Sequence, residues 1–101
     1  MLRIVRENGQ YCPVVVCDWC GQRIEEARQG NYEWEVDEHG LPATGEIFFT
    51  HKQCCLAFEE AHGGRSHWFA SELSVLPVYL SRNLKVDREE AERRAELLSS
   101  I

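Results

Sequence analysis

The chain begins with two short segments rich in β-branched residues, 2–6 and 11–16. Between them stands Asn8-Gly9, a dipeptide in which both residues tolerate the positive φ angles of a two-residue turn. This pattern predicts an antiparallel β-hairpin. Pro13 favours an edge position or a bulge for the returning strand, because proline has no backbone N–H to donate.

Strict alternation of hydrophobic and polar residues over 31–36 predicts a half-buried strand. Its aromatic side chains are expected to face the core, while Glu33 and Glu35 are expected to face the solvent. A second strand is expected over 46–50 and should pair back on the first as a hairpin. The residues between these strands contain two glycines and a proline, which are typical of a loop.

From residue 52 to residue 62 the hydrophobic pattern becomes helical. Cys55 is expected on the inner side of this helix, and Glu59 and Glu60 on its outer side. Two consecutive glycines follow and predict the end of the helix, since glycine is common just past a helix end. The glycine-rich segment 63–66 is therefore the expected boundary between a metal-binding half and a helical tail.

The tail is expected to contain two helices. Leucines at positions 73, 76, 80 and 84 recur at helical spacing. This helix begins either with Ser74 as its N-cap, which puts Pro77 in the first turn, or near Ser71 with a kink. Asn83 is its expected end. Asp87 is the predicted N-cap of the last helix, with Glu90 three residues later as in a capping box.

The length and the net charge of the chain limit the classes of protein to which it can belong. A chain of 101 residues has the length of one small domain, and its marginal core would gain much from a metal ion. Its net charge is −6, whereas nucleic-acid binding relies on lysine and arginine to neutralise phosphates. No apolar run has the length of a signal peptide or a membrane span. We therefore expect a cytoplasmic protein without a membrane anchor.

Two pairs of residues carry the strongest chemical signal. Cys17 and Cys20 are separated by two residues, as are His51 and Cys54. This gap lets one tight turn direct two donor atoms to one point, and Zn²⁺ accepts four thiolate or imidazole ligands in a tetrahedron. The predicted metal ligands are Cys17, Cys20, His51 and Cys54, and the predicted cofactor is Zn²⁺. An odd number of cysteines without an export signal favours metal over disulfides.

With its Cys-x-x-Cys-Gly knuckle, its hairpin and its helix, the segment from Val14 to His62 resembles the treble-clef zinc fingers. The ligand order is similar to that of the first zinc module of LIM domains. The resemblance implies a structural zinc in a module over residues 12–62. The gap between Cys20 and His51 is longer than in LIM domains, and no second pair of this kind follows.

Alternative roles for the remaining cysteines and histidines stay open. Cys55 could replace Cys54 as a ligand, although this breaks the two-residue gap, and Cys12 is expected to pack in the hairpin. The zinc-deaminase signature is missing, since Val16 precedes the first cysteine pair where that signature has proline. His39, the one candidate for a nuclease-type histidine, is expected to be solvated in a turn.

These patterns together predict an α+β fold in one domain, 1–101. An N-terminal hairpin precedes the zinc module over 12–62, and a helical tail follows over 66–101. The expected function is a non-enzymatic intracellular zinc module that contacts an unknown protein partner. The alternatives are a small nucleic-acid-associated regulator and a thiol redox sensor that uses Cys54 and Cys55. The thin apolar stripe of the last helix also allows a homodimer.

Overall fold

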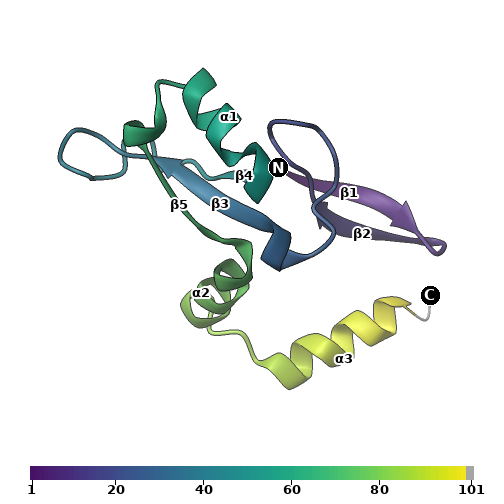
Figure 1. Ribbon diagram of the computed structural model, residues 1–101. Coiled ribbons are helices and arrows are strands. Elements are labelled where there is room, and N and C mark those ends of the chain that lie inside the picture. Colours follow the sequence, from purple (N-terminus) through teal and green to yellow (C-terminus); the bar gives the residue numbers. More distant parts are fainter. Residues whose placement is uncertain (100–101) are drawn as a thin grey trace.

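In a computed structural model of the protein, which describes residues 1–99, the fold is α+β, as predicted. Strands β1 (Leu2–Glu7) and β2 (Gln10–Val15) form the N-terminal hairpin (Figure 1). Glu7 lies opposite Gln10 in the antiparallel register, so Asn8 and Gly9 alone make the turn. Both have positive φ, 51° and 79°, which is the conformation that this hairpin turn requires.

A second sheet has three strands in the order β4-β3-β5. The central strand β3 (Gly30–Glu35) follows a single 3-10 turn over Ala27–Gln29 and pairs antiparallel with β4 (Phe48–His51). This pair is the predicted hairpin. On its other side β3 pairs with β5 (Trp68–Glu72), a strand that the hydrophobic pattern does not reveal. The segment after the glycine-rich break therefore starts by completing the sheet.

The two faces of this sheet have different neighbours. Residues directly opposite one another in the ladder share a face. One face carries Tyr32 and Phe49 and contacts the N-terminal half of the chain, while the other carries Glu33 and Phe48. Helix α1 (Cys55–Ala61) covers that second face (Figure 1). The predicted exposure of Glu33 is therefore wrong: its side chain is fully buried, because β3 is a central strand with both faces covered.

Helix α1 follows a 3-10 turn over Lys52–Cys54 and ends at two glycines with positive φ, as predicted. Phe58 is buried between Phe48 and Trp68, with ring centroids 5.5 and 5.0 Å away. The predicted exposure of Glu59 is also wrong, since only 4% of this residue is accessible to solvent. Glu59 lies four residues after Cys55, one helical turn along the side that faces the sheet.

The tail contains the two predicted helices. A 3-10 turn over Leu73–Val75 leads into α2 (Leu76–Asn83), which has Val75 as its N-cap and Pro77 in its first turn. Neither predicted start is correct, because Ser74 donates its hydroxyl to Glu72 instead of capping the helix and Ser71 belongs to strand β5. Helix α3 (Arg88–Ser99) begins after Asp87, whose carboxylate accepts the Glu90 N–H at 3.1 Å, as an N-cap does.

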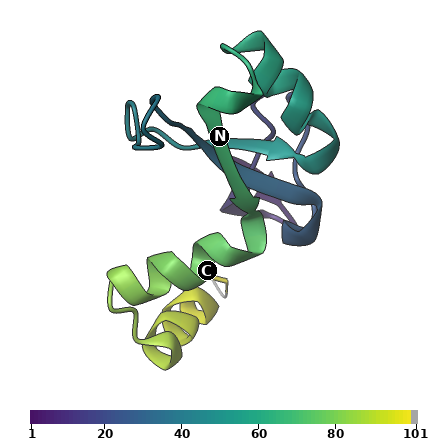
Figure 2. The ribbon, with the colours of Figure 1, turned by 60° about the vertical axis from the view of Figure 1, so that its left-hand side comes forward.

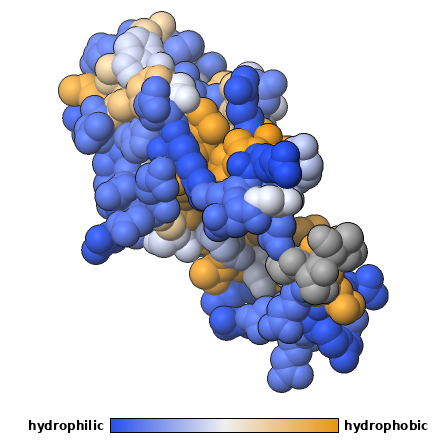
Figure 3. All heavy atoms as spheres, turned by 90° about the vertical axis from the view of Figure 1, so that its right-hand side faces the viewer, coloured by the Kyte–Doolittle hydropathy of each residue, from blue (hydrophilic) through white to orange (hydrophobic). Residues whose placement is uncertain are grey.

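The hydrophobic core is small and lies between the knuckle segment, the sheet and the start of the tail. Its buried residues are Cys17, Ile24, Tyr32, Phe49, Cys54 and Leu73. Helices α2 and α3 extend away from this body (Figure 2). In the space-filling view, apolar side chains are visible among polar ones on both parts (Figure 3). No helix among residues 1–99 is long and apolar enough to cross a membrane.

Candidate metal centre

The two predicted ligand pairs meet in space. Ligand atoms of Cys17, Cys20, His51 and Cys54 all lie within 4.8 Å of one another. Two of these residues, Cys17 and Cys54, are buried members of the core, while His51 is half-buried and Cys20 is exposed. The cluster thus occupies one edge of the core, where it joins two segments that are distant in the sequence.

The first pair lies on a tight turn at the end of β2. The Gly21 N–H donates to the Cys17 carbonyl at 3.0 Å, and the Cys17 N–H donates to the Gln22 carbonyl at 2.9 Å. Gly21 has φ of +76°, a conformation that glycine adopts without the steric cost of a Cβ. The glycine predicted to close this knuckle therefore does so.

Asp18 connects the knuckle to the strand that carries the second pair. Its backbone N–H donates to the Phe49 carbonyl at 2.7 Å, and its carboxylate accepts the Phe49 N–H at 2.8 Å. Phe49 stands two residues before His51 on β4. Asp18 was not among the site residues predicted from the sequence. Its position between two cysteines was the available signal, since aspartate commonly accepts backbone N–H groups at turns.

The Cys17 sulfur is surrounded by backbone donors. The N–H groups of Trp19, Cys20 and His51 donate to it at 3.4, 3.5 and 3.4 Å. Burial alone would raise the pKa of Cys17, but these hydrogen bonds outweigh it and lower the pKa to about 6. The thiolate, which is the form that binds metal, is therefore the main species at neutral pH.

His51 is oriented by a hydrogen bond on the far side of its ring. Nε2 lies 3.2 Å from the Arg23 carbonyl, and Nδ1 lies 3.3 Å from the Cys20 sulfur. A carbonyl oxygen can only accept, so Nε2 carries a proton, and Nδ1 is the nitrogen placed to offer a lone pair to a metal ion. Histidine ligands are commonly held in this way, with one nitrogen free for the metal and the other bonded to a carbonyl.

Cys54 completes the cluster from the start of α1. Burial is the largest cause that raises the pKa of Cys54 to about 12, and the nearby charge and sulfur of Cys17 add to this increase. Several thiolates at one point repel one another, and a divalent cation between them removes this conflict. Three sulfurs and one imidazole nitrogen are a donor set that fits Zn²⁺. The geometry therefore suits a metal ion better than a set of free thiols.

The other cysteines lie outside this cluster. All five are free in the structure, so no disulfide competes for the ligand sulfurs. Cys12 is half-buried in the hairpin, and Cys55 belongs to a separate group with Glu33 and Glu59. Cys55 therefore does not replace Cys54 in the four-residue cluster.

Two further residues singled out by the sequence lie near the surface. His39 is exposed in the loop after β3, as expected of a solvated turn residue. Trp19, at the tip of the knuckle, leaves 46% of its surface accessible.

Comparison of the chain with protein-family models, with curated proteins and with solved structures finds no match to any of them.

Proposed function

We propose that this chain is a non-enzymatic zinc module in which one Zn²⁺ joins the knuckle to the strand and helix of the second pair. The convergence of four zinc-type donors at the edge of the core carries this proposal. Because the protein supplies all four ligands of a tetrahedron, no position remains for water or substrate. A closed site of this kind favours a structural role for the metal.

The order of elements supports a relationship to treble-clef zinc fingers. A knuckle, a β-hairpin and a helix that begins at the last ligand follow one another along the chain. The ligand order also matches that of the first zinc module of LIM domains. We propose a treble-clef module on this basis. All five cysteines are free, which favours a reducing compartment for the protein.

Contact with another protein is the task that the surface favours. Trp19 is exposed at the knuckle tip, and Val78, Tyr79 and Leu80 are each about half exposed on α2. Beside α2 lies a groove whose walls include Trp34 and other apolar side chains. Apolar residues gathered at one surface are typical of protein interfaces. The partner is either another protein or a second copy of this chain.

The two alternative functions find less support. Arg23, Arg28 and Lys52 each form an ion pair with a neighbouring carboxylate, which leaves them poorly suited to bind phosphates. A redox sensor needs reactive thiolates. Burial raises the pKa of both Cys54 and Cys55 to about 12, which keeps them protonated in the metal-free protein.

The structural role of zinc is tested by metal content and folding. The protein is refolded with one equivalent of zinc and examined by native mass spectrometry and near-ultraviolet circular dichroism. We expect one tightly bound zinc ion, and loss of the tertiary signal when a strong chelator removes it. Structural zinc contributes about 10–16 kcal/mol of binding free energy in small finger peptides, which is comparable to or larger than the stability of most domains.

Cys17→Ser and Cys12→Ser provide a matched pair, because the same substitution is made inside and outside the cluster. We expect Cys17→Ser to lose the zinc ion and much of the tertiary signal, and Cys12→Ser to keep both. A chelator-treated protein that stays folded, or equal zinc binding by the two variants, would contradict the proposal.

A further inference from the structure

A second group of metal-type ligands lies on the other face of the sheet. Ligand atoms of Glu33, Cys55 and Glu59 lie within 4.8 Å of one another. Glu33 projects from the middle of β3, and the other two stand one helical turn apart on α1. None of these side chains belongs to the first cluster. Cys54 belongs to the first cluster and Cys55 to the second group, so two consecutive residues point to different candidate sites.

Glu33 leaves one buried oxygen without a partner. The whole residue has an accessible fraction of 0%, and its Oε2 accepts the Thr50 hydroxyl at 2.5 Å. Its Oε1 is buried and has no hydrogen-bond partner among the described residues. A buried carboxylate oxygen left in this state is costly, and nearly all such atoms in proteins are satisfied by a donor or a cation.

Glu59 increases the need for a positive charge at this place. It is almost completely buried, and its Oε2 accepts the Cys55 S–H at 2.8 Å. Two carboxyl groups so close together in the interior cannot both stay ionised without compensation. Of the two cationic residues on the wall of the neighbouring groove, Lys52 and Arg65, Lys52 pairs with Glu72 at 2.6 Å. Either a shared proton or a bound cation must therefore separate the carboxyl groups.

The surroundings of the group favour a cation. A groove of about 570 Å³ runs between α1 and β5, and Cys55, Glu59 and Asn31 form part of its wall. An ion can therefore reach two of the three ligands from solvent. Sulfur and carboxylate oxygen together suit Zn²⁺ and similar transition metals, while Mg²⁺ and Ca²⁺ prefer oxygen alone.

We propose that Glu33, Cys55 and Glu59 bind a second divalent ion of the zinc type, with an open coordination position towards this groove. On binding, the Cys55 thiol gives its proton to solvent, as does the carboxyl pair if it holds one. The charge of the divalent ion then offsets two of the three negative charges of the thiolate and the two carboxylates. Three protein ligands leave a fourth position for water or for a ligand from the groove, as in zinc sites that take part in chemistry.

The test is a titration with Co²⁺, whose absorption bands report on thiolate ligands. In the wild-type protein we expect two successive equivalents to bind. The second should add about one third of the thiolate-to-metal absorbance of the first, because one thiolate binds in place of three. Failure of the first equivalent would contradict the zinc module proposed above, whereas failure of the second alone would overturn this proposal.

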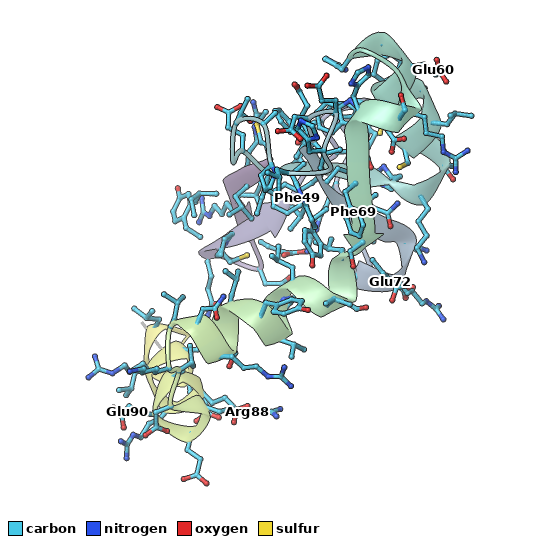
Figure 4. The ribbon with its side chains drawn as sticks, turned by 90° about the vertical axis from the view of Figure 1, so that its left-hand side faces the viewer. Phe49, Glu60, Phe69, Glu72, Arg88 and Glu90 are labelled. Atoms are coloured by element: carbon cyan, nitrogen blue, oxygen red, sulfur yellow. The ribbon has the colours of Figure 1, made fainter. Side chains whose placement is uncertain are left out.

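Glu59→Gln and Glu60→Gln form the matched variants. Glu60 is the exposed neighbour of Glu59 and points away from the body at the end of α1 (Figure 4). We expect Glu59→Gln to bind one equivalent and Glu60→Gln to bind two. Native mass spectrometry with zinc after gel filtration should give the same counts.

The wild-type titration tests the proposal even if Glu59→Gln fails to fold. A protein that binds a single equivalent while fully folded would show that a shared proton, and not a metal ion, separates the carboxyl groups. Two equivalents in Glu59→Gln would equally exclude the assigned ligands.

Discussion

At the scale of single residues, Glu33 shows how burial changes the chemistry of a side chain. Burial, together with the neighbouring carboxyl group of Glu59, raises the pKa of Glu33 from its ordinary value of 4.5 to about 7. Between these two pH values the folded protein binds more protons at this site than the unfolded chain does. The contribution of Glu33 to the free energy of unfolding therefore has its full value below pH 4.5, and it is lost as the pH rises through 7.

Replacement of Glu33 by glutamine should remove this dependence. We expect Glu33→Gln to gain stability relative to the wild type as the pH rises from 4.5 to 8, by up to about 3 kcal/mol. Urea denaturation at a series of pH values, with one zinc ion per chain in both proteins, measures the difference. The pH dependence of the first metal centre is common to both and cancels. Glu60→Gln should follow the wild type, and a constant difference for Glu33→Gln would contradict the expected titration.

At the scale of elements, α1 is held in position by an aromatic cluster centred on Phe58. Phe58 is 2% exposed and packs on Phe48 and Trp68, while the His62 ring lies tilted against it at 4.4 Å between ring centroids. The same helix begins directly after the ligand Cys54. The aromatic cluster that holds α1 on the sheet therefore also helps to position the ligand Cys54 in the metal centre.

Phe58→Ala should accordingly reduce the stability of the whole body. Removal of a buried phenylalanine side chain costs about 3–5 kcal/mol. Leu56→Ala on the same helix is the control: Leu56 is 51% exposed, and we expect a change within about 0.5 kcal/mol. Denaturant unfolding at a fixed zinc concentration compares them. Similar losses in both variants would mean that α1 is not held by this aromatic cluster.

At the scale of the whole molecule, the chain is less compact than most domains of its size. The radius of gyration is 15.6 Å, whereas about 13 Å is usual for 100 residues. The difference arises because α2 and α3 extend from the body. Within α3, the described side chains are exposed except for the half-buried Glu90, which pairs with Arg93 and Arg94 on the helix itself. Because exposed side chains contribute little to stability, we expect α3 to add little to the stability of the body.

Deletion of residues 88–101 should leave the zinc content unchanged and shift the thermal midpoint by less than about 4 °C, since exposed residues contribute little to stability. Deletion of residues 73–101 should instead destabilise the body strongly, because Leu73 is part of the core. Differential scanning calorimetry of the two truncated proteins compares these outcomes. A large shift on removal of α3 alone would show that this helix stabilises the body.

The sequence by itself determined the features that depend on local chemistry. Asn8 and Gly9 specify a two-residue turn, and Gly21 permits the knuckle that begins at Cys17, because these backbone conformations are set by the residues that adopt them. The two-residue gaps likewise indicated the four side chains that the structure brings together. The division of the chain into a module and a tail stays a prediction.

Only the tertiary structure decided which polar residues are buried. Alternation along β3 placed Glu33 on an outer face, and helical spacing placed Glu59 outside α1. That pattern cannot show that β5 completes the sheet or that α1 covers its second face, because both depend on contacts between distant segments. Once these elements pack, the carboxyl groups of Glu33 and Glu59 and the thiol of Cys55 lie next to one another between the sheet and α1. The second candidate site therefore exists only in the folded chain, through long-range packing that no local pattern encodes.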